Sequence, residues 1–311
     1  MKRNLALDRF RGMAVILMVA GNALSDMTDI PAFMRHTEDI GLSFADTIAP
    51  LFLFAIAASY RQSFLKHLRA FNAKAYLNYA YRYLALIGLG TIFSAGGALV
   101  SHETSWGVLQ AIGMAGLLAL PLLKFSPWVR LAAAGAMLAA YQLILDNFLL
   151  DAVLGSSHGG FFGSLAWGAM LILATVMLDF WQKGVRPFLA GSGALSAIAV
   201  LSLYLVPISK NRVSLSYVLV AVAICCVWYY LVCVLTKVFP KRYGFVSCWG
   251  VDPLFFYILH LFLVGLAQLP FSLTDSVRTL PVAVVCDVLI LLILGFIARK
   301  RFHKKAAPEG G

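Results

Sequence analysis

The chain has 311 residues, of which 61% are hydrophobic and 13% are charged, and its mean hydropathy is +0.85. Soluble domains carry about 25% charged residues, so this composition excludes a soluble enzyme and predicts a polytopic membrane protein. The net charge of +11 comes from Lys and Arg residues in short loops between apolar runs, which indicates membrane topology rather than a nucleic-acid groove.

Ten apolar runs of about 20 residues are each long enough to cross a bilayer core of roughly 30 Å. In chain order they cover residues 10–26, 42–62, 78–100, 105–123, 128–146, 160–181, 187–207, 213–236, 246–269 and 279–299. The gaps between them leave no room for a soluble domain. The prediction is an all-α, polytopic integral membrane protein with about ten transmembrane helices, forming one domain over residues 1–306 before a disordered tail at 307–311.

The distribution of basic residues predicts the orientation of these spans. With an even number of spans both termini share one side, and 21 of the 25 Lys and Arg residues fall on that side. The positive-inside rule therefore places both termini in the cytoplasm, and a bacterial inner membrane is the expected location. Four basic residues fall on the other side: Arg35, Lys210, Arg212 and Arg278. One explanation is that they contact phospholipid head groups or pair with the acidic residues there; the other is that they contact a ligand.

Polar residues gather where the first two spans meet the extracytoplasmic side. Asn22 ends the first span, His36 lies in the loop that follows, and Asp46 lies inside the second span. An ionisable group within a span costs several kcal/mol unless it is paired or faces water, so each is a functional candidate. We expect Asp46 to orient the His36 imidazole, as a carboxylate does in an acyl-transfer triad, although a loop histidine is more often a solvated residue.

The ninth span carries a second polar group. Tyr257 and His260 are three residues apart and share a helix face, and Asp287 in the tenth span lies at a similar depth. A His260–Asp287 pair is therefore expected, either structural or catalytic. Pro253 should break the ninth span after Asp252. The five cysteines show no metal-ligand spacing, and no metal is expected.

Four patches of the sequence together resemble one family. The stretch "LDRFRGMAVILMVAGN" resembles the opening of the transmembrane acyltransferases that include heparan-alpha-glucosaminide N-acetyltransferase and its bacterial relatives. In that family a Leu-Asp-x-x-Arg-Gly motif leads into a span ending on Asn, followed by a loop His and a span with Asp and Pro. Here these positions are Leu7, Asp8, Arg11, Gly12, Asn22, His36, Asp46 and Pro50. Three further patches follow in the family's order: "WGVLQAIGMAGLL", "PISKNRVSLSYVL" and "WGVDPLFFYILH".

The resemblance implies an enzyme that moves an acetyl group from cytoplasmic acetyl-CoA to an extracytoplasmic sugar amine or hydroxyl. It implies His36 as base or nucleophile and Asn22 as its partner, with Asp46 as the orienting carboxylate. The chain departs from the family after the loop His, where Glu38 and Asp39 replace a Trp and an Asn-Gly pair. Such an acidic rim would favour a cationic acceptor, such as an amino sugar.

The remaining assignments concern ligands and rival functions. Cations for the donor phosphates are expected at Arg9, Arg11 and Arg82, and substrate contacts at Lys210, Arg212 and Gln110. Expected partners are acetyl-CoA, a sugar or glycan acceptor and the lipid bilayer, with a homodimer left open and no nucleic acid. Two alternatives stay open at this point: a proton-coupled secondary transporter of a small solute, and a non-catalytic membrane scaffold.

Overall fold

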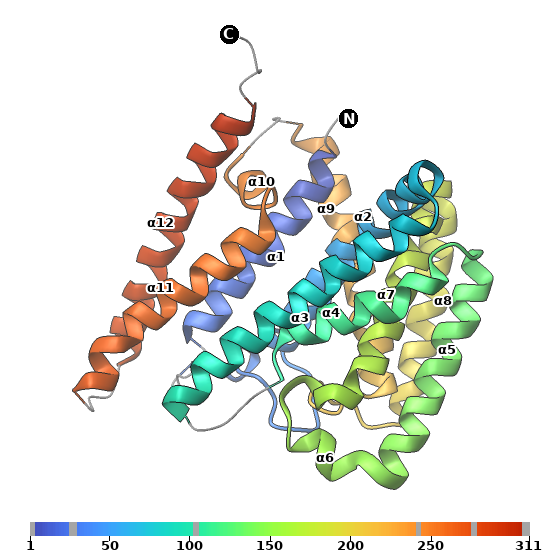
Figure 1. The fold of residues 1–311 in the computed structure, drawn as a ribbon, viewed down its shortest axis with the longest axis horizontal. Helices are drawn as coiled ribbons and strands as arrows, with labels where there is room; N and C mark the ends of the chain where they lie inside the picture. Colours follow the sequence, from blue (N-terminus) through green and yellow to red (C-terminus); the bar gives the residue numbers. More distant parts are fainter. Residues whose placement is uncertain (1–3, 25–29, 102–105, 241–243, 275–278, 307–311) are drawn as a thin grey trace. The chain divides into compact units, whose positions relative to one another are not determined.

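The computed structural model describes residues 4–24, 30–101, 106–240, 244–274 and 279–306. Within these ranges the chain is almost entirely helical and has no β-strand, so the protein is an all-α polytopic membrane protein (Figure 1). Seven helical segments in these ranges are long and apolar enough to cross a membrane. They span Ala45–Phe71, Pro127–Leu154, Ser157–Lys183, Val185–Leu203, Leu215–Val238, Pro253–Phe271 and Leu280–Phe302. The predicted tail at 307–311 and the basic residue Arg278 lie outside the described ranges.

The other three predicted spans fall on helices that differ in length or composition. They coincide with α1 (Leu5–Leu24), α3 (Ala73–Ser101) and α4 (Val108–Ala119). Helix α1 carries three charged residues near its start, and α4 reaches only Leu122 even with the 3-10 turn that continues it. The count of about ten spans therefore stays a prediction, while each predicted run is confirmed as helical.

The ninth predicted span is two helices rather than one. A short helix, α10 (Phe245–Trp249), ends before a turn, and α11 (Pro253–Leu273) begins at the proline. Proline has no backbone N–H and fixes its own φ, so it suits the first position of a helix and cannot continue one. Asp252, which precedes it, accepts a hydrogen bond from Arg301 Nε of α12 (Leu280–Ala306) at 2.8 Å.

The described chain divides into two compact units, with the divisions falling inside α2 (Ile48–Phe71) and α9 (Leu215–Val238). The first unit contains residues 1–36, 43–52 and 228–311, so both ends of the chain contribute to it. In it, α1 packs against α10, α11 and α12 (Figure 1). Its apolar core joins α1 residues such as Val15 and Val19 to Trp249 and Phe256. The single domain predicted over residues 1–306 stays a prediction.

Two glycines let the backbones of α1 and α10 touch in this unit. A Cβ atom on Gly12 would lie 1.8 Å from the carbonyl oxygen of Val246, and one on Gly250 would lie 1.8 Å from that of Asp8. Only glycine fits at such distances, because the obstacle is main chain on both sides. The glycine of the "LDRFRG" motif and the glycine of "WGVDP" are therefore explained by packing.

The second unit contains residues 37–42 and 53–227 and is organised around α7 (Gly160–Lys183). This helix packs against α4, α5 (Pro127–Ile144) and α8 (Val185–Leu203), as Figure 1 shows, and every residue from Ala166 to Asp179 is buried. A helix that is apolar on all sides is expected to lie at the centre of a bundle. After α5 a π-helical stretch (Leu145–Leu149) and α6 (Leu150–Leu154) lead to a tight turn at Ser157–Gly159.

Candidate active site

His36 and Asp46 form a hydrogen-bonded pair in the first unit. The carboxylate Oδ1 of Asp46 lies 2.8 Å from His36 Nδ1. The Asp46 side chain is fully buried, whereas 46% of the His36 side chain is exposed. The backbone N–H and the hydroxyl of Ser43 both donate to Asp46 Oδ2 at 3.0 Å. Asp46 is thus fixed by its neighbours in a 3-10 turn (Ala45–Thr47), and the imidazole it holds is open to an incoming substrate.

This arrangement sets the tautomer of the histidine. An ionised carboxylate can only accept hydrogen bonds, so His36 Nδ1 carries the proton. The lone pair of a neutral imidazole then lies on Nε2, where it can take a proton from an attacking amine or hydroxyl. The pair has the polarity of the base and its orienting acid in an acyl-transfer triad.

Asn22, in the last turn of α1, contacts a different histidine. Its Nδ2 lies 3.0 Å from Nε2 of His260, which is completely buried in the middle of α11. Asn22 was expected to be the partner of His36, and His260 was expected to pair with Asp287; both stay predictions. In the structure Nε2 of His260 contacts Asn22, and the ring of Tyr257 packs edge-on against His260 with centroids 5.3 Å apart. Residues 22 and 260 are 238 positions apart, so no local pattern could have paired them.

Arg212 pairs with an acidic residue of the second unit. We call the group of Asp39, Ser209 and Arg212 the loop clamp. The guanidinium of Arg212 grips Asp39 with two N–H groups, Nε to Oδ1 at 2.7 Å and Nη2 to Oδ2. The Ser209 hydroxyl donates to Asp39 Oδ1 at 2.9 Å. Close by, the Gly41 N–H donates to the Ile208 carbonyl at 2.8 Å. The loop clamp therefore fastens residues 37–42 to the segment before α9.

The loop clamp changes how the acidic rim is interpreted. The hydrogen bonds from Arg212 hold the pKa of Asp39 below its ordinary value, so this carboxylate stays ionised and its charge is balanced. Lys210, two residues before Arg212 in the sequence, is buried. Of the two explanations offered for these basic residues, partnership with an acidic residue is the one that the Arg212 geometry supports. Of the two acidic residues in the rim, Glu38 is the exposed one.

Gln110 also has an internal role. Its Oε1 accepts from the Gly107 N–H at 3.0 Å, and its Nε2 donates to the Ser94 hydroxyl at 3.0 Å. The side chain is buried and lies against Gly90, where a Cβ would come within 2.4 Å of Oε1. Gln110 thus caps the start of α4 and ties it to α3, and its predicted substrate contact stays a prediction.

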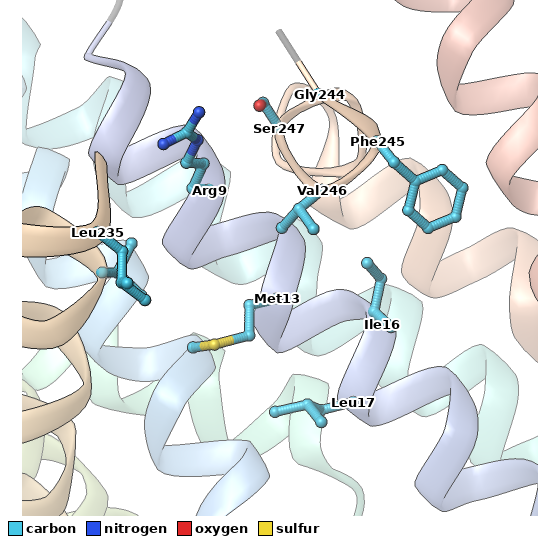
Figure 2. A pocket seen from close by; sticks show the side chains of 10 residues that line it. Arg9, Met13, Ile16, Leu17, Leu235, Gly244, Phe245, Val246 and Ser247 are labelled. Carbon is cyan, nitrogen blue, oxygen red and sulfur yellow. The ribbon is translucent and has the colours of Figure 1, made fainter. Parts of the chain in front are cut away.

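The three arginines expected at the donor end lie in different surroundings. Arg9 donates from Nη2 to the Phe239 carbonyl at 2.8 Å and lines a pocket of about 440 Å³. Figure 2 shows that pocket between the apolar side chains Met13, Ile16 and Leu17 of α1 and the start of α10. Arg11 lies 4.0 Å from Asp8, and Arg82 is exposed on α3.

Helix geometry separates Arg9 from Arg11. Successive residues of an α-helix are about 100° apart, so Asn22, nine residues after Met13, lies about 180° around α1 from the pocket wall. Arg11 precedes Asn22 by eleven residues, which places the two about 20° apart and about 16 Å along the axis. Arg11 therefore shares the face of α1 that presents Asn22, and the Arg9 pocket opens on the opposite face.

A buried charge cluster in the second unit was missed by the sequence analysis. Arg130 has no exposed surface, and its guanidinium meets Asp179 and, at 2.6 Å, the Thr175 hydroxyl. Arg61 donates to the other oxygen of Asp179 at 3.1 Å and to the Leu123 carbonyl at 3.0 Å. The positive-inside count treated both arginines as loop charges. The sequence did contain one signal of this cluster: Asp179, an acidic residue near the end of the sixth predicted span, which needs a buried partner.

The described residues hold no group of three or more His, Cys, Asp or Glu side chains placed to bind a metal ion. A comparison with known protein families finds a match to heparan-alpha-glucosaminide N-acetyltransferase, catalytic, over residues 3–162. That range contains Asn22, His36 and Asp46 and ends well before His260. No curated protein matches the chain significantly.

Proposed function

Because the match over residues 3–162 shows that this chain belongs to the heparan-alpha-glucosaminide N-acetyltransferase catalytic family, we propose that it transfers acetyl from acetyl-CoA to a sugar amine or hydroxyl. The family and the apolar helices together indicate a membrane acetyltransferase. The single observation that most supports the proposed reaction is the His36–Asp46 pair, with its carboxylate buried and its imidazole exposed.

In the proposed reaction, Nε2 of His36 takes the proton from the acceptor amine or hydroxyl as that group attacks the thioester carbonyl carbon. The developing imidazolium is stabilised by Asp46 through Nδ1–H. The Asn22 amide donates to the oxyanion, and one such donor is worth roughly 3 kcal/mol in acyl-transfer sites. When the tetrahedral species collapses, the C–S bond breaks and CoA leaves as the thiol, protonated by His36. Transfer through an acetyl-His36 intermediate satisfies the same geometry.

The donor end of the proposed site is assigned by helix face. Arg11, three turns before Asn22 on the same face of α1, would meet a phosphate of acetyl-CoA while the acetyl group reaches toward Asn22. Arg82 lies on α3 in the second unit, and its contact with the donor stays a prediction. Arg9 can bind acetyl-CoA only if CoA also contacts the opposite face of α1. Arg9 is therefore a weaker candidate than Arg11.

The test uses purified protein in detergent, labelled acetyl-CoA as donor and glucosamine as a probe acceptor. We expect His36→Ala and Asp46→Asn each to lower acetyl transfer at least about 100-fold, the usual contribution of a positioned base. His67→Ala, which changes an exposed histidine on α2, is the matched control and should keep full activity. Wild-type turnover in His36→Ala would refute the mechanism.

A binding measurement separates the catalytic proposal from its rivals. Acetyl-CoA should raise the apparent melting temperature of wild type, His36→Ala and Asp46→Asn alike, because a ligand of the folded state stabilises it. A scaffold without donor binding predicts no shift for any of them. The broken helix at Pro253 fits a transporter, but Asp252 there is paired with Arg301, and proton-driven solute uptake into vesicles is the result that would favour transport.

We also propose that the termini lie in the cytoplasm of a bacterial cell, with the His36 loop on the other side of the inner membrane. The support is the bias of Lys and Arg residues between alternate loops. Single-cysteine labelling in intact cells tests it, after replacing the five native cysteines. A cysteine at Glu38 should react with an impermeant maleimide, and one at Lys124 should not.

A further inference from the structure

The contact between Asn22 and His260 has a consequence for the reaction. Asn22 lies in the last turn of α1, and the buried His260 of α11 contacts it. The two helices are held by an apolar core in which Val19 of α1 lies with Phe256 and Val264 of α11, one turn before and one turn after His260. His260 is therefore a polar group set into an apolar interface, directly against a proposed catalytic side chain.

The donor and acceptor roles in this contact follow from chemistry. An amide nitrogen can only donate a hydrogen bond, so Nε2 of His260 accepts and its proton lies on Nδ1. A carboxamide is planar, and fixing one of its N–H bonds against a rigid acceptor fixes the direction of the second. An oxyanion donor contributes most when its direction is set before the charge develops, since no reorganisation is then needed in the transition state.

We propose that His260 is a positioning residue: its Nε2 holds one N–H of Asn22 so that the other faces the thioester oxygen as it gains negative charge. This proposal rests on the proposed function, because it takes Asn22 as the oxyanion donor. His260 touches neither substrate nor donor, and it acts through Asn22 alone. The hydrogen bond to His260 explains how the Asn22 amide can keep one direction, although it lies in the last turn of α1, where a helix frays most readily.

The first test compares substitutions at residue 260 that differ in where they place an acceptor. Glutamine puts its Oε1 near the position of histidine Nε2, asparagine falls short of it, and leucine has no acceptor. We expect kcat to fall about 10- to 100-fold in His260→Leu and His260→Asn, with KM for acetyl-CoA unchanged, and to recover in His260→Gln. The loss should be smaller than the roughly 100- to 1,000-fold that removal of an oxyanion donor causes.

Two outcomes of this comparison overturn the proposal. One is an unchanged kcat in His260→Leu. The other is an equal loss in His260→Gln and His260→Asn, since a merely structural role would not distinguish two polar amides. If His260→Leu fails to fold, the Gln and Asn variants still decide, with thermal unfolding measured beside activity. A wild type that neither binds nor uses acetyl-CoA refutes the proposed function itself, which is a separate result.

A double-mutant cycle tests whether His260 acts through Asn22. We expect Asn22→Ala to lower kcat by itself, and His260→Leu to lower it no further in the Asn22→Ala background. A full additional loss in the double variant would overturn the proposal, because His260 would then act independently. An NMR measurement on ¹⁵N-histidine-labelled wild type, assigned with His260→Gln, should show the Nδ1–H tautomer for His260. The Nε2–H tautomer would overturn the proposed direction of the hydrogen bond.

Discussion

Replacing Gly12 by alanine tests how tightly α1 is seated in the first unit. The new Cβ would lie 1.8 Å from the Val246 carbonyl oxygen and 2.9 Å from its carbon. Carbon and carbonyl oxygen normally stay about 3.3 Å apart, so the two backbones must separate by about 1.5 Å. Overpacking of a tight site costs typically 1–3 kcal/mol, and we expect about 3 kcal/mol because neither obstacle is a flexible side chain.

The assay is thermal unfolding of the detergent-solubilised protein. For a chain of this size about 3 kcal/mol corresponds to a fall in apparent melting temperature of about 6 °C. The matched control is Gly265→Ala in α11, where a Cβ meets nothing within 4 Å, and alanine should be neutral or slightly stabilising. Gly250→Ala should behave like Gly12→Ala, since it separates the same two backbones. Equal melting temperatures for Gly12→Ala and Gly265→Ala would refute this account of the close contact.

Three further predictions follow from charges described above. Asp179→Ala should lower stability by about 3–5 kcal/mol in the same unfolding assay, because it leaves Arg130 charged in the interior, and a loss below 1 kcal/mol would contradict the buried cluster. Arg11→Ala should raise KM for acetyl-CoA more than Arg9→Ala does, as steady-state kinetics would show, and the reverse order would refute the assignment by helix face. In the loop clamp, the lowered pKa of Asp39 stabilises the fold above its ordinary value of 3.8 and is lost as pH falls through the lower folded value. Asp39→Asn should therefore reduce the free energy of unfolding near pH 6 by less than about 1 kcal/mol, because the pair is partly exposed, and by a smaller amount near pH 3. An equal reduction at both pH values would contradict this account.

Local features of the structure were predictable from the sequence. Apolar runs of about 20 residues form helices because a helix satisfies its backbone hydrogen bonds within the segment itself, and Pro253 gives the break before α11. The ends of helices were harder to place. Helix α2 continues to Phe71, past the predicted end at 62, because Arg and Lys side chains allow a helix to extend beyond the membrane core. His36 and Asp46, ten residues apart, were expected to interact and they do.

Contacts between distant parts of the chain were not predictable. Asn22 with His260, and Arg130 with Asp179, depend on which helix faces which, and one sequence contains no measure of that. Arg212 was a partial success, since partnership with an acidic residue was one of two readings, although Asp39 was not singled out. Residue chemistry therefore pointed to His36, Asp46 and Arg212, whereas partners far apart in the sequence could be assigned only from the fold.

The pairing of Asn22 with His260 also bears on how the protein is made. A ribosome adds about 5–20 residues per second, so the 238 positions from Asn22 to His260 take tens of seconds to synthesise. During that interval α1 is already made, and its terminal amide has no contact with α11. The contact between Asn22 and His260 forms only after α11 has been made, so a chain truncated before α11 cannot form it.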